Sequence, residues 1–517
     1  MKGYLLGIDV GTTIIKCVVF DIQGNEVAKA SHSASIIHPK PGWAEQDMSD
    51  VWNATVLSIK EAIKKANLKS EEIIGISVSG QGAGTWLINE EGKPVCNAIN
   101  WLDGRAANII DRWDENGTIE KLNEICGLRY YSGSGPGIIF RWLIENNPKV
   151  LKESKAVIWA KDWVRYCLTG EIYTDETDPS MGLLDLKTRR YSNDVLKLTE
   201  IEEYSYLLPP IKSSYEMGGK ITKIASEETG LKEGTPVAIG AWDCSSTALG
   251  LGCVLKNEAF SIIGTAGIHM VVTDKPVIDR SYSLSCHTVP GKYLIHSMSM
   301  TAANNLNWFE REFCLAERIE AERKNVSKYD IINEIVSEIP IGSNGIIFLP
   351  FLQGERAPFV EPRARGDFFG LGDWTKRGDL LRAVYEGVAF STLHNYEAME
   401  KGVSFERVRL GGGGSQSSVW AQIISDCTGR VMEVTSGSEY GARGAAINAA
   451  IMLGIYKNHK EAVNEMVKVE RVYEPNPKNT EMYRDLYHIY TNLIESLMKM
   501  WVDMNKLMEE KLISNYK

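Results

Sequence analysis

Long hydrophobic runs are missing from this chain. Hydrophobic residues make up 44% of its 517 residues, yet none of the apolar stretches approaches the ~18 residues that a membrane-spanning helix needs. The first residues lack the charged segment and apolar segment of a secretory leader. The nine cysteines are scattered and form no C-x-x-C pair, which argues against a disulfide framework or a zinc site. We therefore expect a cytoplasmic protein with no membrane partner.

An excess of basic charge is also absent. The formal net charge is −10 and no basic stripe interrupts it, so we expect no nucleic-acid partner. The charged content of 24% is typical of a globular protein with a large buried core. The length excludes a single core and admits roughly three domains or two large ones.

Two apolar runs separated by a Gly-Thr-Thr turn occupy residues 5–20, and this pattern predicts a β-hairpin. Gly11 allows a close approach of the backbone, and the amides and hydroxyls of Thr12 and Thr13 can form an anion cradle. Asp9 stands at the mouth of the turn, where a carboxylate can face a phosphate only with a cation between them. The turn therefore predicts nucleotide phosphates with Mg²⁺, and an ordinary polar hairpin turn is the alternative.

Residues 260–273 repeat this design in a diverged form. Thr265 corresponds to Thr12, and Ile262 takes the place of Asp9, so only the first copy carries the acid on the metal side. Two related hairpins predict two similar lobes that each present a phosphate loop to a shared cleft, although a chance likeness is also open.

Two stretches of the first half are candidates for substrate contact. Residues 73–78 predict a central strand with two apolar faces, and it runs into the glycine-rich residues 79–84. Ligands bind at such strand ends in open α/β sheets, and a tight turn between strands is the alternative. Further on, Trp101 offers a flat apolar wall, and Asp103 and Arg105 offer groups that can orient hydroxyls. A core tryptophan beside a surface salt bridge is the alternative.

A buried strand is predicted to end at Asp243, where a helix begins. Helix amides and the helix dipole would keep that carboxylate ionised, which suits a general base. It equally suits an N-cap, and the local sequence alone favours the cap. The glycine-rich residues 411–418 have the composition of a linker, but a strand and an amphipathic helix adjoin them. We therefore predict a strand-to-helix loop that exposes helix amides to a nucleotide.

The remaining periodic segments predict helices. The first begins near Ser49, which is its expected N-cap, and another ends at a glycine cap, Gly170. Further helices are expected over residues 300–313, 379–400, 419–427 and 439–453, and a long amphipathic tail helix from residue 480.

Several motifs occur in a fixed order between Gly7 and about Tyr490. They include residues 9–16, 42–46, 101–105, 168–170, 349–358, 365–371, 381–387 and 412–414. In these motifs the chain resembles the FGGY family of carbohydrate kinases. The resemblance implies an α/β fold of two ribonuclease-H-like lobes, of the actin/hexokinase/Hsp70 superfamily, around a central cleft. It implies a first lobe over residues 1–245 for sugar and Mg²⁺-phosphate binding, and a second over 246–517 for nucleotide binding, with a helical tail.

The resemblance also implies roles for single residues. Asp243 falls on the catalytic base, which overrides the local preference for a cap, and Asp9 falls on the acid at the Mg²⁺ ion. Residues implied at the nucleotide are Gly11, Thr12, Thr13, Lys16, Gly264, Thr265, Ala303, Asn307, Gly412, Gly413 and Gln416. Residues implied at the sugar, besides Asp243, are Gln81, Gly82, Trp101 and Asp103.

The implied activity is transfer of the γ-phosphate of ATP to a primary hydroxyl of a small ketose or polyol. Typical xylulokinases have Met-His, and glycerol kinases Arg-Glu, where this chain has Gln81 and Gly82. Cys244 and Ile139 also depart from common family residues. The pattern is more similar to the branch of L-xylulose/3-keto-L-gulonate and erythritol kinases, although Ala83 stands where erythritol enzymes often have Asp. The resemblance further implies a possible homodimer. An actin- or Hsp70-like ATPase and a sugar-sensing protein without catalysis are the alternatives.

Overall fold

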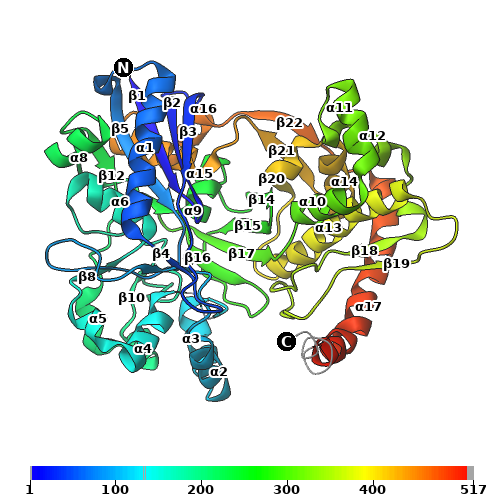
Figure 1. Cartoon of the computed structure of the whole chain (residues 1–517), viewed down its shortest axis with the longest axis horizontal. Coiled ribbons are helices and arrows are strands. Elements are labelled where there is room, and N and C mark those ends of the chain that lie inside the picture. The colour runs from blue at the N-terminus through cyan, green and yellow to red at the C-terminus, as the bar shows by residue number, and fades with distance from the viewer. Residues whose placement is uncertain (1–2, 132, 134, 509–517) are drawn as a thin grey trace. The chain divides into compact units, whose positions relative to one another are not determined.

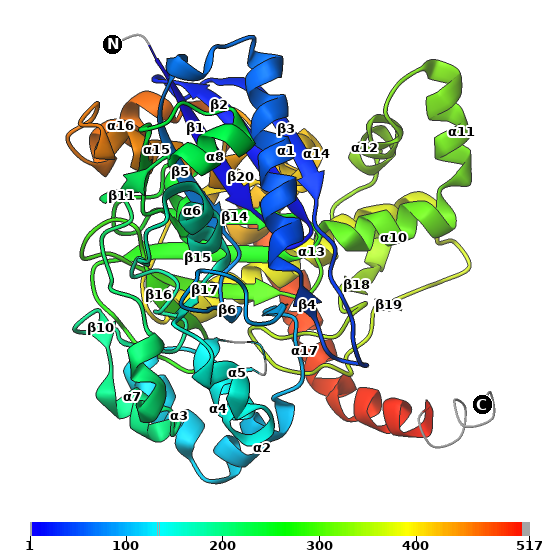
Figure 2. The same cartoon turned by 60° about the vertical axis from the view of Figure 1, so that its left-hand side comes forward.

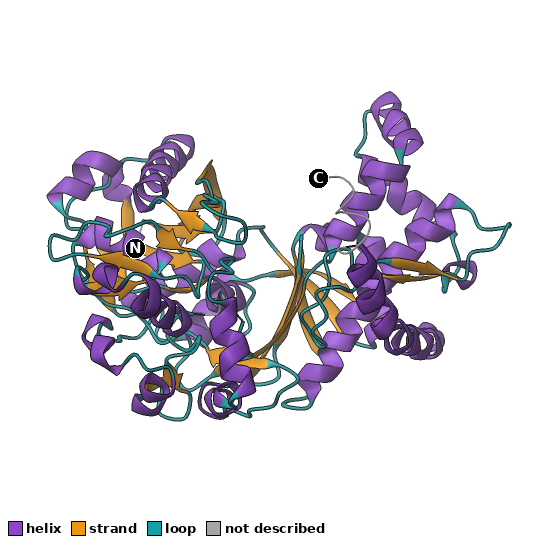
Figure 3. Ribbon diagram, turned by 60° about the horizontal axis from the view of Figure 1, so that its bottom comes forward, coloured by secondary structure: helices purple, strands orange, loops and turns teal. Residues whose placement is uncertain are grey.

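The computed structural model describes residues 3–131, 133 and 135–508. The chain divides into two compact units, and each contains a mixed β-sheet with flanking helices (Figures 1 and 3). The first unit comprises residues 1–256, 272–295 and 437–468, and the second comprises residues 257–271, 296–436 and 469–517.

The sheet of the first unit has the strand order β11-β12-β5-β1-β2-β3, and β13 also pairs with β5. Its strands are β1 (Tyr4–Val10), β2 (Ile14–Asp21), β3 (Glu26–Ser33), β5 (Ile73–Gly80), β11 (Met217–Lys220), β12 (Pro236–Ala238) and β13 (Ala241–Trp242). β1 and β2 pair antiparallel, as the predicted hairpin requires, and β5 runs parallel to β1 and to β12. The predicted central position of β5 is confirmed.

Successive side chains of β1 point to opposite faces of the sheet, so the core of the first unit has one part on each face. Leu6, Ile8 and Val10 pack with α1 (Met48–Ala66), α6 (Ala160–Thr169) and α8 (Lys223–Thr229), and Figure 2 shows α1 lying along this face. Leu5, Val18 and Phe20 pack on the opposite face with α9 (Asp243–Gly250), α15 (Tyr440–Met452) and α16 (His459–Met466). This two-sided burial explains why β1 and β2 are apolar at most positions.

Helix caps test the local predictions. α6 ends at Gly170, whose φ of 74° is left-handed, so the predicted glycine cap is confirmed. The predicted N-cap at Ser49 is wrong. Asp47 has the extended backbone of an N-cap, and its carboxylate accepts from the amide of Ser49 at 2.7 Å.

Smaller elements complete the first unit. Its other helices are α2 (Ala107–Glu115), α3 (Thr118–Cys126), α4 (Pro136–Asn146), α5 (Pro148–Lys152) and α7 (Asn193–Leu198). Three short strand pairs accompany them: β4 (Glu45–Gln46) with β7 (Ala98–Ile99), β6 (Trp86–Ile88) with β8 (Ala156–Ile158), and β9 (Leu184–Asp185) with β10 (Arg190–Tyr191).

The second sheet has the order β16-β17-β15-β14-β20-β21-β22. Its strands are β14 (Ala259–Ile263), β15 (Gly267–Thr273), β16 (Ser283–Cys286), β17 (Tyr293–Ser299), β20 (Arg407–Gly411), β21 (Val431–Thr435) and β22 (Val469–Tyr473). β14 and β15 form an antiparallel hairpin, and β14 runs parallel to β20, as β1 does to β5. The predicted second hairpin is thus confirmed, and it repeats the strand arrangement of the first.

Helices surround the second sheet, and the glycine-rich segment is part of this framework. The helices are α10 (Ala303–Phe313), α11 (Leu315–Lys324), α12 (Lys328–Glu338), α13 (Arg377–Glu400), α14 (Ser418–Thr428) and α17 (Pro477–Leu507). The short pair β18 (Ile347–Leu349) and β19 (Asp367–Phe369) lies beside them. β20 ends at Gly411 and Ser417 caps α14, so a short loop and not a linker joins them, as predicted.

Two expectations from composition can be compared with the fold. All nine cysteines are free thiols, so the prediction of no disulfide framework is confirmed. Among the residues that the structure describes, no helix is both long and apolar enough to span a bilayer.

Candidate active site

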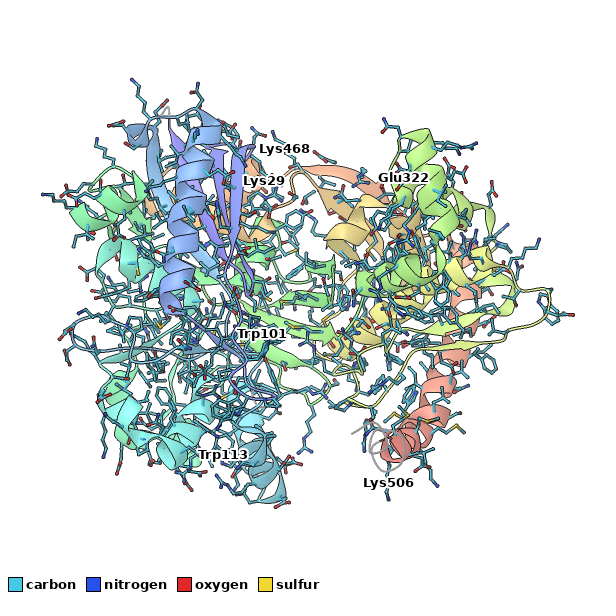
Figure 4. All side chains as sticks on the ribbon, in the orientation of Figure 1. Lys29, Trp101, Trp113, Glu322, Lys468 and Lys506 are labelled. Carbon is cyan, nitrogen blue, oxygen red and sulfur yellow. The ribbon has the colours of Figure 1, made fainter. Side chains whose placement is uncertain are left out.

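The first Gly-Thr turn is tightly closed and tied to the predicted sugar wall. The amide of Gly11 donates to the carbonyl of Ile14 at 3.2 Å, and a Cβ on Gly11 would lie 2.7 Å from that oxygen. Only glycine fits at position 11, because the backbone of Ile14 approaches so closely. Trp101, labelled in Figure 4, donates from Nε1 to Oγ1 of Thr12 at 3.0 Å. Thr13 is exposed at the tip of the turn.

Three buried side-chain amides, those of Gln46, Gln81 and Asn100, form a network that is attached to this turn. Gln46 donates from Nε2 to the carbonyl of Thr12 at 2.7 Å, and Gln81 donates to Oε1 of Gln46 at 2.6 Å. Nδ2 of Asn100 donates to the side-chain oxygens of both glutamines at 2.9 Å. The sequence does not mark Gln46 and Asn100 as site residues, although Gln46 ends the motif at residues 42–46 and Asn100 precedes Trp101.

Asp9 has an unused buried oxygen. Its Oδ1 has no hydrogen-bond partner among the described residues, and a Cβ on Gly441 of α15 would lie 2.9 Å from its Oδ2. Burial raises the pKa of Asp9, and the charge of Lys16 opposes this effect. No cluster of three or more metal-ligating side chains occurs in the described part of the chain. A single free carboxylate fits Mg²⁺ in a phosphate site, because Mg²⁺ there takes one or two carboxylates together with phosphate and water oxygens.

Lys16 is paired with Glu439. Its Nζ lies 2.8 Å from Oε2 of Glu439, and Lys29 contacts the other oxygen at 3.0 Å. Burial alone would lower the pKa of Lys16, but Glu439 and Asp9 outweigh it, so the pKa is raised and the ammonium form is kept. The sequence reasoning missed Glu439, whose only signal is its place directly before the small-residue helix α15.

Asp243 is the first residue of α9, and Trp242 occupies the N-cap position. The local prediction of an N-cap is therefore wrong. β13 and β1 both run parallel to β5, with Ala241 and Asp9 on opposite sides of Ser79, so the two carboxylates lie at one end of the sheet. Burial raises the pKa of Asp243 to about 7, and repulsion from Asp9 adds to the effect. A carboxylate with a pKa near neutrality is well matched to accept a proton.

We expect Asp243 to titrate near pH 7 in the ligand-free protein, above its ordinary pKa of 3.8. The protonated form cannot accept a proton, so kcat/KM should fall as the pH drops below this pKa. Asp9→Asn removes the repelling charge and should lower the pKa of Asp243, while burial keeps it above the ordinary value. Carboxyl ¹³C NMR titration of the wild type, with Asp243→Asn to assign the signal, measures both. A wild-type pKa near 4 would contradict this environment.

Gly82 and Asp103 differ in what they offer a substrate. A Cβ on Gly82 would lie 2.4 Å from Cδ1 of Trp242, so only glycine fits beside this indole. The carboxylate of Asp103 accepts from the amide of Ala44 at 2.7 Å and from the guanidinium of Arg105 at 2.8 Å. Its contacts in this structure are therefore to protein, and its predicted role at the sugar stays a prediction.

The second Gly-Thr turn is anchored on the start of α10. The amide of Ala303 donates to the carbonyl of Gly264 at 2.7 Å, and the amide of Ala302 donates to the carbonyl of Thr265 at 2.9 Å. Asn307 lies one turn further along α10, where its Oδ1 accepts from the hydroxyl of Tyr329 at 3.0 Å.

The glycine-rich loop adjoins the same turn, because β20 pairs with β14 with Gly411 opposite Ile262. Gly412 has a φ of 82°, and a Cβ there would lie 2.7 Å from the carbonyl of Ile263. A Cβ on Gly413 would meet no atom within 4 Å, and Gln416 is exposed. Gly264, Thr265 and Ala303 thus lie beside Gly412 and Gly413 at two adjoining strand ends.

Comparisons with known proteins agree on one family. Residues 4–250 match the N-terminal domain of the FGGY family of carbohydrate kinases, and residues 259–453 match its C-terminal domain. The chain is 31% identical to L-xylulose/3-keto-L-gulonate kinase of Escherichia coli over 96% of its length and 98% of the relative. It is 30% identical to xylulose kinase of Staphylococcus epidermidis over 98% and 99%. The crystal structure of gluconate kinase from Lactobacillus acidophilus is similar, with a TM-score of 0.88, 25% identity and coverage of 97% and 99%.

Proposed function

Because the chain belongs to the FGGY family of carbohydrate kinases and is an ATP-dependent carbohydrate kinase, we propose that it phosphorylates a primary hydroxyl of a small ketose or polyol. The proposal depends chiefly on the position and the environment of Asp243. It begins α9 at the strand end shared with Asp9, and burial raises its pKa to about 7.

An L-xylulose-, xylulose- or erythritol-like compound is the proposed substrate. The three similar proteins described above are named as kinases of L-xylulose and 3-keto-L-gulonate, of xylulose and of gluconate, and all of these compounds are short polyhydroxy chains. The proposed sugar wall consists of Gln81, Gly82, Trp101 and Asp103. Within it, Trp101 offers a ring face on which an apolar edge of such a chain can pack, and the buried amide network holds Gln81 rigidly.

In the proposed mechanism, the oxygen of the substrate hydroxyl attacks the γ-phosphorus of ATP in line, Asp243 accepts the hydroxyl proton, and the bond from the γ-phosphorus to the departing ADP breaks. Lys16 and the turn amides of Thr12 and Thr13 would face the phosphate and favour its developing charge, while Gly11 closes the turn that presents them. Asp9 would hold Mg²⁺, which when bound neutralises phosphate charge. The second unit contributes the nucleotide residues Gly264, Thr265, Ala303, Asn307, Gly412, Gly413 and Gln416.

The proposal also assigns a function to each half of the chain, a cellular location and a state of assembly. Residues 1–245 carry the sugar and Mg²⁺-phosphate functions, and residues 246–517 carry nucleotide binding. The enzyme acts in the cytoplasm on a free sugar or polyol, either alone or as a homodimer.

A coupled assay of ADP release over pentuloses, hexuloses and tetritols tests the function. We expect ATP turnover to depend on one of these acceptors. Turnover of ATP that no acceptor stimulates would favour an actin- or Hsp70-like ATPase. Acceptor binding without any turnover would favour a sugar-sensing protein.

Asp9→Ala should raise the Mg²⁺ concentration needed for half-maximal rate by at least about tenfold, since even the loss of a supporting residue weakens a metal site to that extent. The free buried Oδ1 of Asp9 is the reason for this expectation. Initial rates over a Mg²⁺ titration at fixed ATP measure the change. An unaltered Mg²⁺ dependence in the Ala variant would remove Asp9 from the metal site.

A further inference from the structure

A fully buried ionic cluster of the first unit has no part in the proposed mechanism. Nζ of Lys161 lies 2.7 Å from Asp162, 3.2 Å from Asp175 and 3.1 Å from Asp178. The exposed fraction of all four side chains is 0%. Buried charges resist displacement, because separating one from its partners leaves an uncompensated charge in a low dielectric. The cluster is therefore a rigid support for the segments that hydrogen-bond to it.

The hydroxyl of Thr177 attaches β13, the strand directly before Asp243, to this cluster. Thr177 Oγ1 donates to the carboxylate of Asp175 at 2.8 Å and accepts from the amide of Trp242 at 2.8 Å. Trp242 is the N-cap residue of α9, directly before Asp243. The backbone of the residue before the base is thus held by a side chain about 65 positions away in the sequence.

The cluster also lies close to Gly80 and Gly82, at the end of β5 that leads into the predicted sugar wall. A Cβ on Gly82 would lie 3.1 Å from Oδ1 of Asp178 as well as 2.4 Å from the indole of Trp242. A Cβ on Gly80 would lie 2.9 Å from the amide nitrogen of Lys161. Both oxygens of Asp178 lack a hydrogen-bond donor with good geometry among the described residues. The cluster therefore supports both the end of β5 and the start of α9.

We propose that Thr177 is a positioning residue that fixes the direction of the Asp243 carboxylate through the backbone of Trp242, with the Lys161 cluster as its support. The proposal rests on the proposed role of Asp243 as the base. The side chain at the first helical position is aimed by the backbone dihedrals at the N-cap, so the hydrogen bond to Trp242 restrains the geometry of proton transfer. A contribution to folding stability alone is the competing explanation.

Four variants separate these explanations. Thr177→Val and the smaller Thr177→Ala remove the hydroxyl, and Thr177→Ser keeps it. Ser214→Ala is the matched control, because the hydroxyl of Ser214 donates to the same carboxylate of Asp175 at 2.7 Å without contacting Trp242 through that hydroxyl. Steady-state kcat and KM for the sugar and for ATP are measured for each variant, together with Tm.

Thr177→Val and Thr177→Ala should lower kcat by about 10–100-fold with both KM values unchanged, since misplacement of a catalytic group by about 1 Å costs up to about 10²-fold. Thr177→Ser should restore most of the rate, and Ser214→Ala should lower Tm without lowering kcat. Equal losses of kcat in Ser214→Ala and the two hydroxyl-free variants would overturn the proposal, as would unchanged kcat in Thr177→Ala. If Asp243→Asn retains wild-type kcat, the proposed role of Asp243 as the base fails, and if no acceptor stimulates ATP turnover in the wild type, the proposed function itself fails, whatever the Thr177 variants do.

Discussion

Asp243→Asn is expected to lower kcat by about 10²–10⁴-fold, the range for loss of a general base. Asparagine has the shape of aspartate, but its amide accepts no proton at neutral pH. Nucleotide affinity should stay at the wild-type value. The residues proposed to bind the nucleotide belong to the Gly-Thr turns and the glycine-rich segment, and the substitution at Asp243 leaves them unchanged. Steady-state kinetics with the best acceptor and calorimetric titration with MgADP measure the two effects.

Asp194→Asn is the matched control for this variant. Asp194 lies in the first turn of α7, so its replacement also removes a carboxylate from a helix N-terminus in the same unit, at an exposed position outside the proposed site. We expect its kcat to equal that of the wild type. An active Asp243→Asn enzyme would show that another group accepts the proton.

The fold could be predicted because its signals are local. Apolar runs broken by Gly-Thr turns specify both hairpins, and their repetition predicts two similar lobes, which the matching strand arrangements of the two sheets confirm. The family resemblance and the actin-like α/β fold that it implies are likewise confirmed. The errors lie at helix starts. Asp47 rather than Ser49 caps α1, and Trp242 precedes α9, because an N-cap depends on the dihedrals of one residue and not on composition.

The site could be predicted only in part, for a related reason. Asp9 and Gly264 carry their signal in the turn beside them. Gln46 and Glu439 carry little, because each acquires its role from a partner distant in sequence. Glu439 meets Lys16 across 423 positions, and Gln46 meets Thr12 across 34. No periodicity or spacing predicts such a contact, which exists only after the sheet and its helices have packed.

The packing of α9 on α15 gives the largest expected effect on stability. A Cβ on Gly444 of α15 would lie 1.9 Å from the carbonyl oxygen of Ser246, and a Cβ on Gly250 of α9 would lie 1.9 Å from that of Tyr440. Both obstacles are backbone atoms, so no side-chain rotation can relieve the overlap. The helices approach this closely only because glycine lies on each side of the contact.

Gly444→Ala should therefore destabilise the protein by about 3 kcal/mol, the upper part of the usual range for overpacked cores. This loss exceeds the gain of about 1 kcal/mol that alanine brings to a helix interior. The catalytic rate should fall as well, because α9 begins with Asp243 and Gly441 of α15 lies against Asp9. Denaturant unfolding followed by tryptophan fluorescence measures the stability, and the coupled assay measures the rate.

Gly137→Ala in α4 is the control, because it makes the same substitution in another buried helix of the unit. A Cβ on Gly137 would meet its nearest atom, Cδ2 of Leu183, at 3.6 Å, which is ordinary van der Waals contact. We expect its stability to be unchanged or raised by up to about 1 kcal/mol. If Gly444→Ala proves as stable as Gly137→Ala, α9 and α15 do not approach as closely as described.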